Sequence, residues 1–307
     1  MPIYERDPWR LQYFARVPCP EGVRIPTDDA DAWTWYPEHR WIYDKLRVAD
    51  SQGLACGPHG VTPERFPVFS KPMMNMEGMG IGSRAVAGAD DLDRHYQPGH
   101  MWMDLLQGRH VSTDCAVLDG KVVWSRHATG VPGEAGTFRH WTIHAGADAA
   151  LDVYLGAWVV EHMAGYSGMI NFETIDGRII EVHLRFADQW VDLYGAGWVE
   201  ALVGLYARNR WEFADTDRRD GYSVPLFATH GAQFRHPSAR EQAAIRAMPG
   251  VSSLQITFFE AKDPSEHPMP PGGFRLGIVN SFDLVQAKTA RRALAACFPA
   301  EFVKIEE

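Results

Sequence analysis

Short stretches of alternating apolar and polar residues recur along the chain, and Gly, Pro or Asp residues end most of them. Such stretches predict half-buried β-strands, because successive side chains of a strand point to opposite faces. The clearest ones lie at residues 67–72, 100–106, 110–117, 166–175 and 178–184. Two Asp-Gly pairs, at 119–120 and 176–177, are typical of tight hairpin turns.

Apolar residues at helical spacing predict helices over residues 36–52, 148–164 and 188–210. After residue 220 come a strand, a helix over 237–247, two further strands and a helix over 283–297. This order predicts an α+β protein with mostly antiparallel hairpins. We expect an N-terminal arm over 1–40, a core over 41–220 and a C-terminal α+β lobe over 221–307.

Composition excludes several classes of protein. The 307 residues are 46% apolar and 22% charged, which is ordinary for a globular protein and excludes disordered, collagen-like and coiled-coil chains. The net charge is −9 without any basic run, so general nucleic-acid binding is not expected. No stretch approaches the ~18 apolar residues of a membrane span. Four scattered Cys residues and a polar N-terminus predict a cytoplasmic protein without disulfides.

The most informative segment is the hairpin GMINFETIDGRIIEVHLRFADQ at 168–189. Counting outward from its turn places Glu173 opposite Glu181, and Glu181, His183 and Arg185 then share one strand face. Two opposed carboxylates repel each other unless a cation lies between them, and carboxylate oxygens suit Mg²⁺. The alternative is a solvated strand face on which Arg185 neutralises both carboxylates, and the residue pattern leaves both interpretations open.

Lys71 ends an apolar strand and precedes a loop with Gly78, Gly80 and Gly82. Glycines let backbone N–H groups approach a phosphate closely and form an anion-binding nest. The spacing matches neither a P-loop nor a Rossmann fingerprint. A flexible hairpin without ligand is the alternative here.

Four segments in this order resemble the ATP-grasp superfamily of carboxylate ligases. They are DK at 44–45 with the following GLACGPHG, FPVFSKP with its glycine-rich loop, MWMDLLQGRHVSTD, and GMINFETIDGRIIEVHLR. The resemblance spans about residues 40–195, and the PPGGFRLGIVN segment with its Ala-rich helix is similar to the small lobe of the biotin-carboxylase-like branch. It implies an ATP-grasp fold in which two α+β lobes grip a nucleotide.

The resemblance also implies site residues. Lys71 would contact the ATP phosphates, Gly78, Gly80 and Gly82 would close over them, and Glu173, Glu181 and His183 would hold the metal. Arg185 would stabilise the transferred phosphoryl group. Four strand residues would offer their backbone groups to the adenine, and they are Trp102, Met103, Asp104 and Leu105. His110 would lie at the ribose. The cofactors expected are ATP and Mg²⁺, with Mn²⁺ favoured if an imidazole is a ligand.

Three departures from the family pattern are visible. His183 stands where the family has Asn, and His110 stands where a ribose-binding Glu is usual, although Asp104 and Asp114 are possible substitutes. The N-terminal arm is also shorter than the α/β domain that usually precedes the core. Arg126 and His127 follow the 119–121 hairpin and are candidates for the same cleft or for the surface.

The reaction implied is the activation of a small-molecule carboxylate as an acyl-phosphate and its capture by an amine. A homodimer that completes the cleft is a further expectation, since the usual preceding domain is missing. The alternative is a degenerate, non-catalytic ATP-grasp protein with a nucleotide-binding or assembly role.

Overall fold

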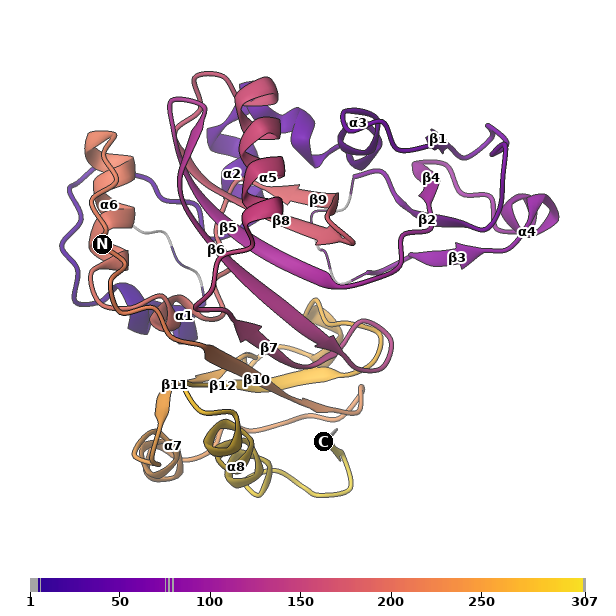
Figure 1. Ribbon diagram of the computed structural model, residues 1–307. Helices are drawn as coiled ribbons and strands as arrows, with labels where there is room; N and C mark the ends of the chain where they lie inside the picture. Colours follow the sequence, from indigo (N-terminus) through magenta and orange to yellow (C-terminus); the bar gives the residue numbers. More distant parts are fainter. Residues whose placement is uncertain (1–4, 6, 75, 77, 79, 306–307) are drawn as a thin grey trace. The chain divides into compact units, whose positions relative to one another are not determined.

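The chain forms two compact units, each built from several segments (Figure 1). The computed structural model describes residues 5, 7–74, 76, 78 and 80–305. The internal unit comprises Pro26–Ser125 and Tyr154–Phe186, and the terminal unit comprises Met1–Ile25, Arg126–Val153 and Ala187–Glu307. These boundaries differ from those expected at 40 and 220, because β6 and α5 each run from one unit into the other. These shared elements are β6 (Lys121–Pro132) and α5 (Ala149–His162).

The internal unit contains two antiparallel arrays of strands. The four-stranded sheet has the order β1-β4-β2-β3, and β5, β8 and β9 are paired in the order β5-β8-β9. Their bounds are β1 (Cys56–Pro58), β2 (Val68–Pro72), β3 (Arg84–Val86), β4 (His100–Asp104), β5 (His110–Leu118), β8 (Gly168–Ile175) and β9 (Arg178–His183). Both Asp-Gly turns and five of these strands, β2, β4, β5, β8 and β9, therefore lie where the alternation of residues predicted them.

One predicted helix, over 36–52, is two elements. The 3₁₀ helix η1 (Pro37–Tyr43) ends at Asp44, and α3 (Lys45–Asp50) begins there. Asp44 breaks the helix because its carboxylate accepts the free backbone N–H groups of Leu46 and Arg47 at 3.0 and 3.3 Å, which caps a new helix. Lys45 is thus the first residue of α3, a position that the helical spacing alone does not reveal.

Gln52, two residues after the end of α3, binds the edge of β9. The Gln52 amide donates to the carbonyl of Ile179 at 2.6 Å and accepts from its N–H at 2.9 Å. These two bonds satisfy backbone groups on the outer edge of β9, which would otherwise be open for pairing. The contact sets the distance between α3, with Lys45 at its start, and the hairpin that carries Glu181.

The terminal unit has an antiparallel sheet in the order β11-β12-β10-β7-β6, and β13 also pairs with β10. Helices α7 and α8 cover one face of β10, β11 and β12 (Figure 1) and enclose an apolar core with Leu226, Leu254 and Leu276. The strands are β7 (Phe138–Ile143), β10 (Gly221–Ala228), β11 (Val251–Ile256), β12 (Phe274–Ser281) and β13 (Val303–Lys304). The helices α7 (Ala239–Arg246) and α8 (Leu284–Ala295) lie where sequence spacing predicted them.

The remaining elements are short. The predicted helix over 188–210 is interrupted, because Gly195 and Gly197 have left-handed φ angles of 109° and 89°. Each unit also takes part of the N-terminal arm, where α1 lies against β11 of the terminal unit and α2 packs on η1 of the internal unit. The bounds are α1 (Pro8–Phe14), α2 (Asp29–Trp35), α4 (Ala89–Arg94), η2 (Val191–Leu193), α6 (Trp198–Arg208) and η3 (Pro264–Glu266).

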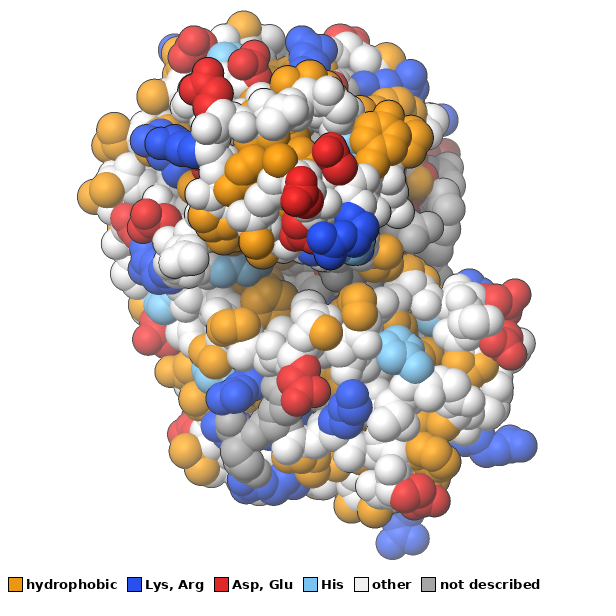
Figure 2. Space-filling model, turned by 90° about the vertical axis from the view of Figure 1, so that its right-hand side faces the viewer, with side chains coloured by type: hydrophobic (Ala, Val, Ile, Leu, Met, Phe, Trp, Pro, Cys, Tyr) orange, Lys and Arg blue, Asp and Glu red, His pale blue; other side chains and the backbone are white. Residues whose placement is uncertain are grey.

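These elements confirm the α+β class predicted from the sequence. Among the described residues, no helix combines the length and apolar character that crossing a membrane requires. Figure 2 shows one face of the molecule, on which acidic and basic side chains are interspersed rather than gathered by sign.

Candidate functional site

Polar side chains gather on one face of the β5-β8-β9 array. Residues paired across antiparallel strands share a face. One row across the strands is Ser112, Glu173 and Glu181, and the next is Asp114, Asn171 and His183. The other face carries Phe172 and Val182, both buried, and Trp158 of α5 packs edge-on against Phe172. The array thus has an apolar face toward α5 and a polar face that collects the predicted site residues.

The pairing of Glu173 with Glu181 is confirmed by the register of the β8–β9 hairpin. The two-residue turn Asp176-Gly177 pairs Ile175 with Arg178 and Thr174 with Ile179. A regular ladder would next pair Glu173 with Ile180, but the register shifts there, so Ile180 is an extra residue. This β-bulge brings Glu181 opposite Glu173.

Each glutamate of the pair has its own basic partner. His110 Nε2 lies 3.2 Å from Glu173 Oε2, and Lys45 Nζ lies 2.9 Å from Glu181 Oε1. Burial works against ionisation of Glu173, but His110, together with His183 and Arg185, outweighs it and holds the pKa of Glu173 well below its ordinary value. Burial also works against a charged His110, yet Glu173 raises the pKa of that imidazole. His110 and Lys45 are therefore the nearest basic partners of the two carboxylates, while Arg185, which the solvated-face alternative assigned to both, is paired with Asp29.

Lys71 reaches the same hairpin from β2. Its ammonium donates a hydrogen bond to the carbonyl of Ile180, the bulged residue, at 2.7 Å. Only 6% of the residue is exposed. Burial, followed by repulsion from Lys45, lowers the pKa of Lys71 to about 8, while the two glutamates act in the opposite direction. Two ammonium groups and two carboxylates therefore influence one another at this hairpin.

Lys45 is a site residue that the sequence analysis did not single out. Its backbone N–H donates to the carbonyl of Met73 at 2.9 Å, which ties the start of α3 to the segment after β2. This bond holds the two lysines as neighbours, and only 7% of Lys45 is exposed. The signal was present in the DK pair at 44–45, where an Asp cap precedes a lysine that faces an acidic hairpin.

His183 and Arg185 share a partner from the N-terminal arm, the carboxylate of Asp29. His183 Nδ1 lies 3.0 Å from both oxygens of Asp29, and Arg185 Nη2 lies 3.1 Å from Oδ2. The hydroxyl of Tyr43 donates to Oδ1 at 3.3 Å. Burial works against ionisation of Asp29, but Arg185 and His183 outweigh it and the pKa of Asp29 lies below its ordinary value. Asp29 is the second site residue that sequence reasoning missed.

The glycine-rich loop joins β2 to β3, as the sequence predicted. Gly78, Gly80 and Gly82 have φ angles of 69°, 68° and 75°, in the left-handed region that side chains avoid. Asn75, Glu77 and Met79 of this loop lie outside the described residues. The closing of this loop over phosphates stays a prediction.

The predicted adenine segment lies mostly inside a sheet. Trp102 and Met103 of β4 are paired with β1 on one side and β2 on the other, so the ladders engage their backbone groups. Their side chains are buried in two apolar clusters. Asp104 accepts from the N–H of Ala55 at 3.1 Å and pairs with Arg65. Of the four residues, Leu105 alone follows the strand, and this corrects the expectation that all four offer backbone groups to a base.

The possible substitutes at the ribose position are engaged elsewhere. Asp104 has the two partners just described, and Asp114 accepts from Asn171 Nδ2 at 2.7 Å with 1% of its surface exposed. His110 itself is paired with Glu173. The structure therefore brings the ribose candidate His110 to the acidic hairpin and leaves Asp104 and Asp114 in structural hydrogen bonds.

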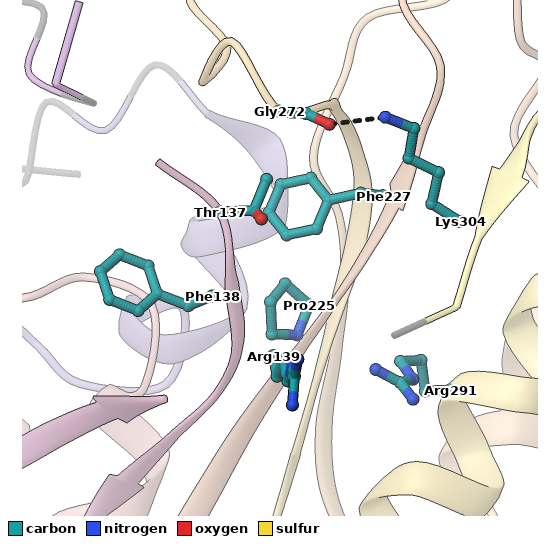
Figure 3. Close-up of a pocket in the computed structure, with 8 residues that line it drawn as sticks. All are labelled: Thr137, Phe138, Arg139, Pro225, Phe227, Gly272, Arg291 and Lys304. Carbon is teal, nitrogen blue, oxygen red and sulfur yellow. Dashed lines mark hydrogen bonds between the residues drawn. The ribbon is translucent and has the colours of Figure 1, made fainter. Parts of the chain in front are cut away.

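Arg126 and His127 belong to the terminal unit and are buried, which corrects the surface alternative. Arg126 pairs with Asp215 at 3.0 Å, and His127 Nε2 lies 3.2 Å from Asp152. A pocket of the same unit holds none of the predicted residues. Figure 3 shows it between β7, β10 and α8, with the Lys304 ammonium bound to the carbonyl of Gly272 at 2.8 Å.

The acidic hairpin fits a metal ion that takes its remaining ligands from substrate phosphates and water. In the described part of the chain, no three His, Cys, Asp or Glu side chains are placed to hold a metal together. Glu173, Glu181 and His183 are therefore not gathered as a complete three-ligand site. Mg²⁺ commonly takes one or two protein carboxylates and completes its shell with water and substrate phosphates. The opposed glutamates, flanked by two lysines, match that chemistry.

Comparison with solved structures decides the fold. Phosphoribosylamine–glycine ligase from Thermotoga maritima matches with a TM-score of 0.63 at 13% identity, over 96% of this chain and 88% of that one. L-amino acid ligase from Bacillus licheniformis matches with a TM-score of 0.59 at 13% identity, over 87% and 73%. Biotin carboxylase from Campylobacter jejuni matches with a TM-score of 0.56 at 12% identity, over 92% and 74%. The chain has the ATP-grasp fold.

Sequence comparison adds no family to this fold assignment. No protein-family model matches it, and no curated protein matches it closely enough to count. At 12–13% identity the likeness establishes the ATP-grasp fold, as the order of the four sequence segments predicted, and not the reaction. The roles of the individual residues have to be argued from the contacts above.

Proposed function

We propose that the chain is an ATP- and Mg²⁺-dependent ligase that activates a carboxylate as an acyl-phosphate and joins it to an amine. The supporting observation is the arrangement at the β8–β9 hairpin. There, buried Lys45 and Lys71 act on the opposed Glu173 and Glu181 within one unit. Three of the similar solved structures are a ligase of L-amino acids, a ligase of glycine and a carboxylase complexed with an ATP analogue.

The acidic side chains at the hairpin are paired with basic ones in the absence of ligand. Lys45 is paired with Glu181, His110 with Glu173, and Arg185 with Asp29. A triphosphate would give Lys45 and Lys71 new anionic partners in place of Glu181 and the Ile180 carbonyl, and Glu181 would then be free to bind a divalent cation together with Glu173 and the phosphates. The ion pairs of the free protein are thus exchanged rather than lost when nucleotide binds.

The reaction would need no covalent enzyme nucleophile. A carboxylate oxygen attacks the γ-phosphorus, the bond to the bridging oxygen breaks, and ADP leaves. The amine then attacks the acyl carbon, the acyl–phosphate bond breaks, and the amine nitrogen loses a proton as phosphate departs. The protein contributes positioning and neutralisation of the phosphate charge, which supply the rate in phosphoryl transfer.

The test is the release of ADP and phosphate across a library of amino acids and small acids, each offered with and without amines. We expect release that requires both substrates and Mg²⁺. Glu181→Gln should lose it, whereas Glu161→Gln, at an exposed position of α5, should retain it. No release with any pair of substrates, or full release by the Glu181→Gln variant, would contradict the proposal.

A second function is favoured by one contact. Arg185, assigned to the transferred phosphoryl group, donates instead to Asp29, and its Nη1 donates to the carbonyl of Phe186 at 3.3 Å. A nucleotide-binding protein without catalysis would tolerate this arrangement. Nucleotide binding that ignores Mg²⁺, together with no ADP release, would support this second function over the ligase.

A further inference from the structure

Asp29 holds the imidazole ring of His183, a residue of the proposed metal site, in one orientation. Both oxygens of the Asp29 carboxylate lie 3.0 Å from His183 Nδ1, and Arg185 Nη2 lies 3.4 Å from the same nitrogen. Nδ1 therefore faces Asp29, whose oxygens can accept its hydrogen bond. The ring nitrogen left to face another partner is Nε2, which lies 3.8 Å from Glu181 Oε1.

We propose that Asp29 is a positioning residue that makes His183 a nitrogen ligand, through Nε2, of a divalent cation shared with Glu181, and that this selects Mn²⁺ over Mg²⁺. A carboxylate that holds one ring nitrogen while the other binds a metal is the usual outer-shell arrangement of metal-binding histidines. The inference rests on the proposed function, since it concerns the cation that accompanies the nucleotide.

The two proposed ligand atoms are near each other but not at ligand spacing. Two atoms that are each about 2.1 Å from one six-coordinate ion lie about 3 Å apart when adjacent. Nε2 and Oε1 are 3.8 Å apart, so they would have to approach by roughly 0.8 Å to be adjacent ligands of one ion. A cation would take the place of a proton on Nε2, while Asp29 keeps the ring from rotating.

The second ligand sphere is built from separate parts of the chain. Asp29 lies in α2 of the N-terminal arm, 154 residues before His183. The hydroxyl of Tyr43 and Arg185 also contact the carboxylate, so it is held on three sides. Mg²⁺ strongly prefers oxygen ligands, whereas a first-row transition metal accepts imidazole nitrogen. A histidine fixed in this way therefore favours Mn²⁺.

The test uses Mn²⁺ with ADP and measures binding and electron spin echo modulation, neither of which requires turnover. We expect a ¹⁴N coupling from imidazole that disappears in His183→Asn and persists in His110→Gln, the other histidine near the glutamates. Asp29→Asn should weaken Mn²⁺ binding by roughly 10–100-fold. Asp28→Asn is the matched control, because Asp28 caps α2 and does not contact His183.

The outcomes separate this inference from the proposed function. If Mn²⁺ binds with ADP but shows no ¹⁴N coupling, or a coupling that survives in His183→Asn, the inference is wrong and the nucleotide site stands. Unchanged Mn²⁺ affinity in Asp29→Asn would also overturn it. If no cation binds together with ADP, the proposed function fails as well. The His183→Asn measurement remains decisive should loss of Asp29 unfold the protein.

Discussion

Glu173 lies directly across the β8–β9 hairpin from Glu181, although a regular ladder from the Asp176-Gly177 turn would pair it with Ile180. The bulge at Ile180 makes the difference. It keeps Ile179 and Val182 on the buried face although they are three residues apart, and it leaves the Ile180 carbonyl to accept from Lys71. One extra residue thus joins the acidic pair to the lysine.

Deleting Ile180 should leave the pairing of the glutamates intact but detach Lys71. The ladder would continue from Thr174–Ile179 directly to Glu173–Glu181, so each later side chain keeps its face. We expect a folded variant that is less stable by about 1–3 kcal/mol, because a half-buried apolar side chain is lost. Urea unfolding checks this. Inserting one residue after Ile180 should instead turn the side chains of Glu181 and His183 to the opposite face of β9 and abolish nucleotide binding. Equal nucleotide binding by the deletion and insertion variants would contradict the account.

Nucleotide affinity should fall as the pH rises through about 8, the pKa of Lys71 in the free protein. Above this pH the buried amine is neutral, so binding a phosphate requires proton uptake, and each further pH unit costs up to about tenfold in affinity. Calorimetric titration with ADP in buffers of different ionisation enthalpy measures that uptake at pH 8.5. The Lys71→Arg variant should bind ADP without this proton uptake. Proton uptake that persists in Lys71→Arg would assign the titration to another group.

The His110–Glu173 pair should stabilise the fold in a defined pH window. The pKa of His110 is raised, so its contribution is complete below the unfolded value of about 6.5 and is lost as the pH rises through the folded value. The pKa of Glu173 is lowered, so its contribution is present above about 4.3 and is lost in acid. We expect NMR titration to give His110 a pKa above 6.5 that falls in Glu173→Gln. An unchanged pKa in this variant would mean that the pair does not form.

The strands and helices were accessible from sequence because their patterns are local. Alternation marked β5, β8 and β9, and two Asp-Gly pairs marked their turns. Counting symmetrically about Gly177 predicted the pairing of Glu173 with Glu181 correctly. The count did not include the bulge at Ile180, without which Glu173 would be paired with Ile180. A bulge depends on what the strand packs against, here Ile179, Val182 and the ammonium of Lys71, and no short sequence pattern records that.

The basic and acidic partners were harder to predict, since they are distant in sequence. Asp29 is 154 residues from His183, in an arm without clear periodicity. The alternative in which Arg185 neutralises both glutamates assumed that residues on one strand pair with each other, whereas Asp29 competes for Arg185 from another element. Lys45 lay inside an apparently continuous helix over 36–52, and the DK pair at 44–45 did not by itself mark the lysine as a partner of the acidic hairpin.

The central claim is that a divalent cation binds between Glu173 and Glu181 together with a nucleotide held by Lys45 and Lys71. The most direct test is the affinity for ADP, measured calorimetrically with and without Mg²⁺ or Mn²⁺, in the unmodified protein and in Glu181→Gln. The account predicts that the cation tightens ADP binding at least roughly tenfold, about 1.4 kcal/mol, and that Glu181→Gln removes this gain. ADP binding that is equally tight without the cation, or a gain that Glu181→Gln retains, would contradict it.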